Sequence, residues 1–173
     1  EKNSNKLKIL FILSRSNHYN SVDVRAFKLF IKVFQKFKDQ IDLKIKDRPD
    51  IESPLIKLFL KEKLIKQNNI IRNNKDLIED NIIDADLCIG TCSSGLTKQA
   101  VWLNKPIIQI FRDELVQYQL NFSINVKNEG ELEKIFKKFL KKNFANNRKK
   151  MAQLLNSSIQ PQKKPSKIFL DFF

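Results

Sequence analysis

The sequence predicts an α/β domain: a doubly wound parallel sheet with helices on both faces. Residues 8–13 form a nearly continuous apolar run, as in a strand that is buried on both faces of a parallel sheet. Strand-like and helix-like segments then alternate along the chain. Residues 87–111 contain a strand, a loop of small residues, a helix, a turn and a second strand, which is the crossover that parallel strands require.

The composition supports one folded domain. The chain has 173 residues, enough for one well-cored domain and too few for two ordinary ones, and its 42% hydrophobic content argues against disorder. We expect residues 1–156 to form the domain and residues 157–173 a proline-containing linker and apolar tail. No apolar run approaches the roughly 18 residues that span a bilayer. Because the first residue is Glu and no signal peptide precedes the first strand, we expect a piece of a longer protein.

The first half of the chain supplies three strand–helix steps. Residues 24–38 carry Phe at helical spacing, which predicts an amphipathic helix against the core. Residues 41–45 alternate apolar and polar side chains, as in a strand. Pro54 suits the first position of a helix over residues 55–66, because that position needs no amide hydrogen. Residues 70–72 form a short third strand.

The second half repeats the same alternation. Residues 76–83 start with acidic side chains, which suit the positive end of a short helix. Asn128 is a plausible N-cap, with three Glu in the turn that follows. The remaining predicted elements are strands at residues 87–89, 107–111 and 122–126, helices at residues 96–103 and 148–156, and a surface loop at residues 112–121.

The net charge of +14 has two interpretations. Lys is used heavily throughout, so the charge can be a feature of composition alone. A polyanion partner is the alternative, but the charges are spread over most helices instead of gathering with aromatic residues in one stripe, which argues against a nucleic-acid surface. Nucleic-acid binding would show a steep fall of affinity with salt. The Lys-rich helices could instead rest on an anionic membrane, and the positive field would draw in a diphosphate ligand.

The pattern of Cys, His and Ser residues argues against a zinc site, a reactive thiol and a serine hydrolase. Cys88 and Cys92 form a lone C-x3-C with a single His elsewhere, which argues against zinc, and we expect no metal. We interpret both cysteines as reduced thiols in a cytoplasmic protein, with Cys88 buried. His18 is a weak acid/base candidate in a distant loop, and the absence of G-x-S-x-G argues against Ser93 as a nucleophile.

The loop of small residues after the fourth strand is the main candidate site. Two of the three glycines in the chain, Gly90 and Gly95, bound it, and Thr91, Ser93 and Ser94 add hydroxyls. Free backbone amides at a helix start favour an anion. The alternative is a plain connection in which Ser caps the helix. Neither G-x-G-x-x-G after the first strand nor G-x4-G-K-[ST] is present, which argues against a dinucleotide oxidoreductase and a P-loop ATPase.

Basic side chains follow two other predicted strands. Ser14 and Arg15 come directly after the first strand, and Lys46 and Arg48 follow the second. Carboxyl ends of parallel strands meet at one edge of a sheet, so these residues should join the small-residue loop there. We therefore predict an anion clamp, although residues 46–48 could also form a solvated turn.

Residues 85–110 carry a resemblance to a known family. The Ala-Asp start, the strand, the paired Ser, the Gln99-Ala100 step in the helix and the Lys-Pro before the next strand resemble the nucleotide-sugar-binding, carboxyl-terminal half of GT-B glycosyltransferases. Enzymes of surface-polysaccharide biosynthesis, sugar-nucleotide 2-epimerases and polyol-phosphate transferases are similar here. The resemblance implies a Rossmann-like half of a GT-B fold.

The resemblance also implies roles for individual residues. Ser93, Ser94 and Gly95 would hold the donor phosphates, and Gln99 would meet the ribose. The family has Glu at that position, so a bidentate grip on the ribose diol is lost, and Arg48 stands where relatives often have His.

It further implies a nucleotide-sugar donor as substrate, no cofactor, and a second, amino-terminal domain with the usual catalytic base. We expect the donor-binding half of a glycosyltransferase that makes a cell-surface glycan, in the cytoplasm or on the inner face of the membrane. The alternatives are a catalytically silent binding or assembly module for a phosphorylated ligand, which the Gln favours, and an epimerase or polyol-phosphate transferase relative.

Overall fold

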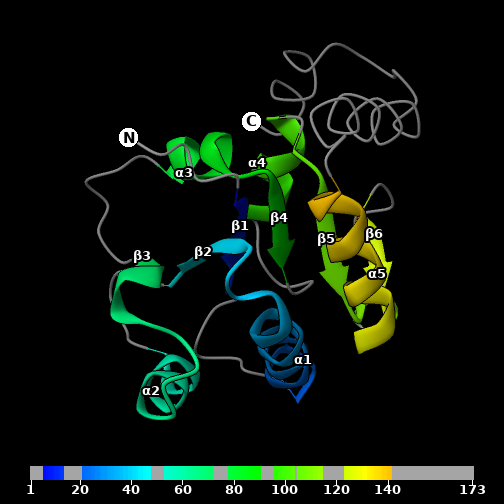
Figure 1. Ribbon diagram of the computed structural model, residues 1–173. Helices are drawn as coiled ribbons and strands as arrows, with labels where there is room; N and C mark the ends of the chain where they lie inside the picture. Colours follow the sequence, from blue (N-terminus) through cyan, green and yellow to red (C-terminus); the bar gives the residue numbers. More distant parts are fainter. Residues whose placement is uncertain are drawn as a thin grey trace.

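The computed structural model describes residues 6–13, 21–47, 53–71, 78–90, 96–103, 105–114 and 123–141. These residues contain one six-stranded sheet in which every pairing is parallel (Figure 1). The strand order is β3-β2-β1-β4-β5-β6, so the chain starts in the middle and winds first to one edge and then to the other. This confirms the doubly wound α/β prediction. The strands are β1 Leu7–Ile12, β2 Ile41–Lys46, β3 Ile70–Ile71, β4 Leu87–Gly90, β5 Ile107–Ile110 and β6 Ile124–Val126.

The helices lie on both faces of the sheet (Figure 1). Three of them, α1, α2 and α5, bury side chains in one apolar cluster, while α3 and α4 contribute to a second cluster on the opposite face. Their bounds are α1 Ser21–Phe37, α2 Pro54–Lys61, α3 Ile78–Asp84, α4 Leu96–Trp102 and α5 Glu129–Leu140, with short 3-10 turns at η2 Gln67–Asn69 and η3 Arg112–Glu114.

β1 is the centre of both cores. Its side chains alternate between the two faces, so Phe11 joins the larger cluster and Leu10 the smaller one. The Phe11 ring packs against Phe27 and Phe30 of α1, with centroid distances of 4.9 and 4.4 Å. Each such buried ring contributes about 1.5–3 kcal/mol. Burial on both faces explains why residues 8–13 form a nearly continuous apolar run.

The second helix is shorter than predicted. We expected it to reach residue 66, but α2 ends at Lys61 because the chain turns at Lys63, which has a left-handed φ of 54°. The Leu64 amide donates to the Phe59 carbonyl at 2.9 Å and the Lys63 amide to Leu60 at 3.0 Å, which is a Schellman ending. Glycine usually occupies that position, so the sequence carried no stop signal. The turn allows Ile65 to be buried.

Other boundaries agree more closely. α1 begins at Ser21, three residues before the predicted start. Asn128 caps α5 as predicted, with its side-chain oxygen accepting the Glu131 amide at 3.0 Å. The Glu131 carboxylate accepts the Lys127 amide in return, at 2.7 Å. Part of the predicted loop at residues 112–121 is the turn η3, and the predicted helix at residues 148–156 and the tail lie outside the described residues.

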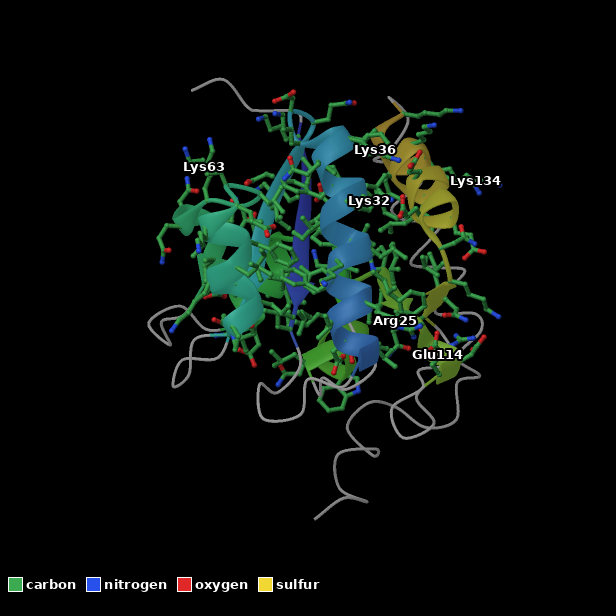
Figure 2. All side chains as sticks on the ribbon, turned by 90° about the horizontal axis from the view of Figure 1, so that it is seen from below. Arg25, Lys32, Lys36, Lys63, Glu114 and Lys134 are labelled. Carbon is green, nitrogen blue, oxygen red and sulfur yellow. The ribbon has the colours of Figure 1, made fainter. Side chains whose placement is uncertain are left out.

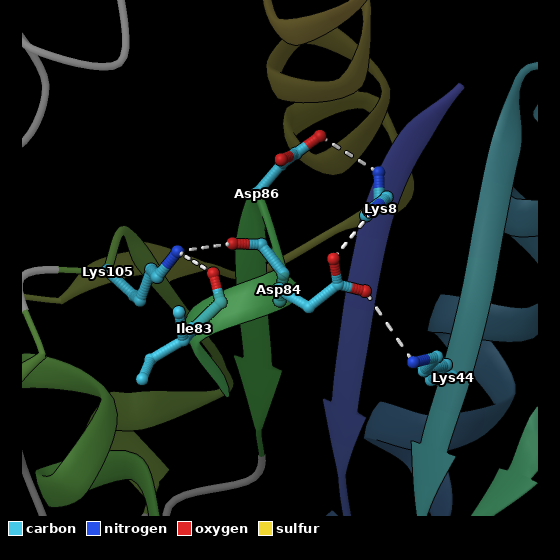
Figure 3. A network of polar contacts seen from close by, with 7 residues as sticks. Lys8, Lys44, Ile83, Asp84, Asp86 and Lys105 are labelled. Atoms are coloured by element: carbon cyan, nitrogen blue, oxygen red, sulfur yellow. Dashed lines mark hydrogen bonds and ion pairs between the residues drawn. The ribbon is translucent and has the colours of Figure 1, made fainter. Parts of the chain in front are cut away.

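The amino-terminal edge of the sheet is held by an ion-pair network (Figure 3). The Lys8 ammonium donates to Asp84 at 2.5 Å, and Lys44 lies 3.6 Å from the other oxygen of the same carboxylate. The hydrogen bond between Lys8 and Asp84 raises the pKa of the Lys8 ammonium and lowers the pKa of the Asp84 carboxyl. Asp86, which is only 8% exposed, accepts the Lys8 backbone amide at 3.0 Å. This network joins β1, β2 and the start of β4.

Lys105 closes the other side of this edge. Its ammonium donates to the backbone carbonyls of Ile83 and, at 2.9 Å, Ala85, at the carboxyl end of α3 (Figure 3). A cation there satisfies carbonyls that the helix leaves without partners. The Ala-Asp and Lys-Pro parts of the motif therefore lie at the edge opposite the predicted ligand site, where they make structural contacts.

Candidate functional site

The candidate site is the carboxyl edge of the sheet between β1 and β4. β1 leads to α1 on one face and β4 leads to α4 on the other, so the chain direction switches here. Open α/β sheets bind ligands at such a switch point. Ile12 is in register with Lys46 of β2 and with Gly90 of β4, so the ends of the three strands lie level.

Most of the predicted clamp lies outside the described residues. This applies to Ser14, Arg15, Arg48, Thr91, Ser93, Ser94 and Gly95. The described strands end at this edge immediately before those segments, which agrees with the predicted common edge. Two predicted residues, Lys46 and Gln99, are described.

Lys46 lies on the same face of the sheet as α4. It is in register with Ile12, whose side chain belongs to the cluster under α3 and α4. Partial burial lowers the pKa of Lys46, and the neighbouring Asp47 offsets this only in part. Asp47 is itself buried, and its carboxylate accepts the Ser53 amide at 3.4 Å. Lys46 is thus a partly desolvated cation that an anion would stabilise.

Gly90 allows α4 to pack closely on the end of β4. A Cβ built on Gly90 would lie 2.7 Å from Cγ2 of Thr97, a distance that real Cβ atoms do not show. Thr97 is only 2% exposed, so either its side chain or α4 would have to shift. The glycine does not have a positive φ, so the position requires space and not an unusual backbone conformation.

Gln99 has a buried atom that needs a partner. Its side-chain carbonyl oxygen is inaccessible to solvent, and within the described part of the chain it is the one such side-chain atom without a hydrogen bond. A buried acceptor without a donor costs about 1–3 kcal/mol. Gln99 lies in α4, which packs on the same face of the sheet as Lys46.

A polar cluster that was not predicted from the sequence lies at the ends of β5 and β6. Gln109 is fully buried, and its side-chain oxygen accepts the Ser123 hydroxyl at 2.6 Å. The Arg112 guanidinium donates to the Ser123 carbonyl at 3.0 Å, and the Arg112 amide donates to the Asn125 side chain at 3.1 Å. A Gln inside the apolar strand I-I-Q-I was the available signal, because a buried amide needs a specific partner.

Phe111 ties this cluster to α1. It follows β5 directly and has a left-handed φ of 57°, which is unusual for a bulky residue. The Arg25 guanidinium of α1 lies 4.9 Å from its ring centre and also pairs with Glu114 of η3 (Figure 2). These contacts hold the segment that follows β5, at the carboxyl edge of the sheet, against α1.

The described residues contain a buried thiol, no cluster of metal-ligating side chains and no membrane-spanning helix. Cys88 is buried and is a free thiol, and burial raises its pKa to about 12, so it stays protonated at neutral pH. Over the described ranges no three His, Cys, Asp or Glu side chains gather as metal ligands. None of the helices in those ranges is long and apolar enough to cross a membrane.

Solved structures show the same architecture. The chain matches the spinosyn rhamnosyltransferase SpnG with a TM-score of 0.55 at 12% identity, and SpnG complexed with spinosyn aglycone with a TM-score of 0.54 at 12% identity. Each match covers 88% of this chain and 42% of that one. The likeness shows the fold.

A third structure supports the same conclusion. A putative UDP-N-acetylglucosamine 2-epimerase from Listeria monocytogenes matches with a TM-score of 0.53 at 16% identity, over 87% of this chain and 40% of the other. This chain therefore spans about two fifths of the length of these structures. It has the Rossmann-like fold of one half of a GT-B structure. No protein-family model and no curated protein sequence matches the chain.

Proposed function

We propose that the chain is the nucleotide-sugar-binding, carboxyl-terminal domain of a GT-B-type glycosyltransferase that makes a cell-surface glycan. The observation that carries the proposal is the placement of Lys46, Gly90 and α4 on one face at the switch point of the sheet. Neighbouring strands are about 4.8 Å apart, so the Cα atoms of Lys46 and Gly90, two strands apart, are separated by about 10 Å. A diphosphate between them is within reach of the Lys46 side chain.

The described side chains suit the two ends of such a donor. An anionic diphosphate would offset the burial that lowers the pKa of Lys46. The unpartnered oxygen of Gln99 is an acceptor for a ribose hydroxyl. Arg15, Arg48 and the Ser93-Ser94 segment follow the same strand ends in sequence and supply further donors.

The reaction follows from these roles. An acceptor hydroxyl attacks the anomeric carbon of the sugar, and the bond from that carbon to the diphosphate oxygen breaks. Cations at the edge stabilise the negative charge that develops on the departing diphosphate. The acceptor and the base that takes its proton belong to a partner domain, in line with the greater length of the similar structures. The protein would act in the cytoplasm, at the inner face of the membrane when its acceptor is lipid-linked.

Calorimetry with UDP, CDP and GDP tests donor binding on this chain. We expect one nucleotide to bind with a dissociation constant in the micromolar range. Ser94→Glu should abolish binding by repelling the phosphates. Gln99→Glu should strengthen it through a carboxylate grip on the ribose. Lys134→Gln, on the exposed side of α5, is the charge control and should change nothing. Absence of binding by all three nucleotides at millimolar concentration would contradict the proposal.

A second candidate is a catalytically silent module that uses the same edge for a phosphorylated ligand. Gln99 in place of an acidic residue favours it. Turnover of a nucleotide sugar by the full-length protein would exclude this candidate. Conversion of UDP-N-acetylglucosamine to its 2-epimer without an acceptor would point instead to an epimerase relative.

A further inference from the structure

A cleft lies at the edge of the sheet opposite the candidate site, beside the amino end of β2. Its volume is about 390 Å³, within the range of small-molecule sites. The end of α1, the start of β2 and the turn after α2 surround it. Ile41 lies five residues before Lys46 on β2, so the cleft is about 17 Å from the proposed donor edge.

Four lysines from three segments line this cleft: Lys6, Lys38, Lys63 and Lys66. Within the described ranges none of their ammonium groups has a hydrogen-bond or ion-pair partner. Elsewhere on α1 the pattern differs, because Lys32 pairs with Glu129 at 2.7 Å and Lys36 pairs with Glu133. The cleft therefore gathers cations that the fold itself does not neutralise.

The backbone conformation at Lys63 favours glycine over lysine. Lys63 occupies the left-handed position of the Schellman ending of α2, where glycine is the usual residue and a side chain is strained. The turn nevertheless carries an exposed cation, which lies near the end of α2 in Figure 2. A non-glycine residue in this strained conformation that also lines a charged cleft favours a ligand-binding role for its side chain.

The rest of the lining indicates the kind of ligand. Asp39 and Asp42 add carboxylates, which accept hydroxyl hydrogens and repel a continuous phosphate backbone such as nucleic acid. Asn69 stiffens one wall, because its amide donates to the Leu43 carbonyl at 2.9 Å and its oxygen accepts the Lys66 amide at 2.8 Å. The ligand should carry phosphates for the lysines and hydroxyls for the carboxylates.

We propose that this cleft binds a small phosphorylated sugar or polyol at a site separate from the donor edge. The phosphates contact the lysines, and the hydroxyls of the ligand donate to Asp39 and Asp42. The proposal does not depend on the donor function, because it rests on different residues at the other edge of the sheet.

Amide NMR of the whole chain with fructose bisphosphate tests the site. We expect shift changes at residues 38–42 and 63–69, also when the chain is already loaded with any nucleotide that binds it. The double variant Lys38→Gln/Lys66→Gln should weaken binding by about tenfold or more, the size of one charge-assisted hydrogen bond. The matched double variant Lys134→Gln/Lys137→Gln on α5 should leave it unchanged. Equal losses in both double variants, shifts confined to the carboxyl edge, or no shifts at millimolar ligand would overturn the proposal.

Two further variants test the proposal. One separates the role of Lys63 in binding from its role in stability, and the other separates recognition of the sugar from binding of any polyphosphate. Lys63→Gly should weaken binding while keeping or raising the melting temperature; a lower melting temperature with unchanged affinity would assign Lys63 to the fold instead. Asp42→Asn should weaken fructose bisphosphate but strengthen inorganic tripolyphosphate, because the carboxylate repels anions and accepts hydroxyls. Equal strengthening of both ligands would exclude recognition of the sugar.

Discussion

Gly90→Ala tests whether close packing of α4 on β4 holds the candidate site together. The added methyl would lie 2.7 Å from Cγ2 of Thr97 and 3.7 Å from the Ile12 carbonyl oxygen. Thr97 is buried and branched at Cβ, so its side chain has few rotamers into which the methyl could move. α4 must therefore shift outward from the end of the strand.

The size of the effect follows from two opposing contributions. Overpacking a buried site costs typically about 1–3 kcal/mol. Alanine also restricts the unfolded chain, which returns about 0.4–1 kcal/mol because the backbone at Gly90 is open to alanine. We expect a net loss of about 1–2 kcal/mol in the free energy of unfolding. The free energy of nucleotide binding should fall by more than the free energy of unfolding, because the displaced helix carries Gln99.

A double-mutant cycle with Thr97→Ser isolates the contact. Serine removes Cγ2 but keeps the hydroxyl, so Gly90→Ala should cost about 1 kcal/mol less in the serine background. Urea unfolding followed by circular dichroism gives each free energy, and an unchanged m-value shows that two-state unfolding is preserved. Additive effects of the two substitutions, or a fully stable Gly90→Ala protein, would refute the packing argument.

Three other substitutions have defined outcomes. Lys46→Met should stabilise the protein by up to about 1 kcal/mol at pH 7 and weaken nucleotide binding. Since the pKa of Lys46 is lower in the folded state, the unfolded chain holds its proton more tightly, and wild-type stability should rise with pH between the folded pKa and 10.5. The gain from Met should therefore shrink over this range, and a gain that is the same at pH 7 and above pH 11 contradicts the argument. Asp86→Ala should cost about 1–3 kcal/mol in urea unfolding, because the Lys8 amide loses its acceptor; a neutral effect would mean that water replaces it. Asn128→Ala should cost about 1 kcal/mol by removing the cap from the Glu131 amide, with Asn128→Asp as the control that keeps it.

The local sequence was sufficient for the elements and their order. The apolar run of β1, the phenylalanine stripe of α1 and the Asn128 cap each have a short-range physical cause, so they could be predicted without a structure. The end of α2 could not, because the left-handed turn at Lys63 carries no glycine and is held by the burial of Ile65. Burial of that kind is decided by the rest of the fold.

The candidate site also has features that could be predicted from the sequence and features that could not. Strand ends with basic and small residues were visible in the sequence, and they predicted a common ligand edge. The face on which Lys46 lies, the contact between Gly90 and Thr97, and the unpartnered oxygen of Gln99 depend on register between strands that are distant in the chain. The order of strands and helices along the chain follows from local periodicity, so it could be predicted from the residues alone. Which side chains share a face, and which lysines remain unpaired, depends on strand pairing and packing across the whole sheet, so the fold was needed to establish them.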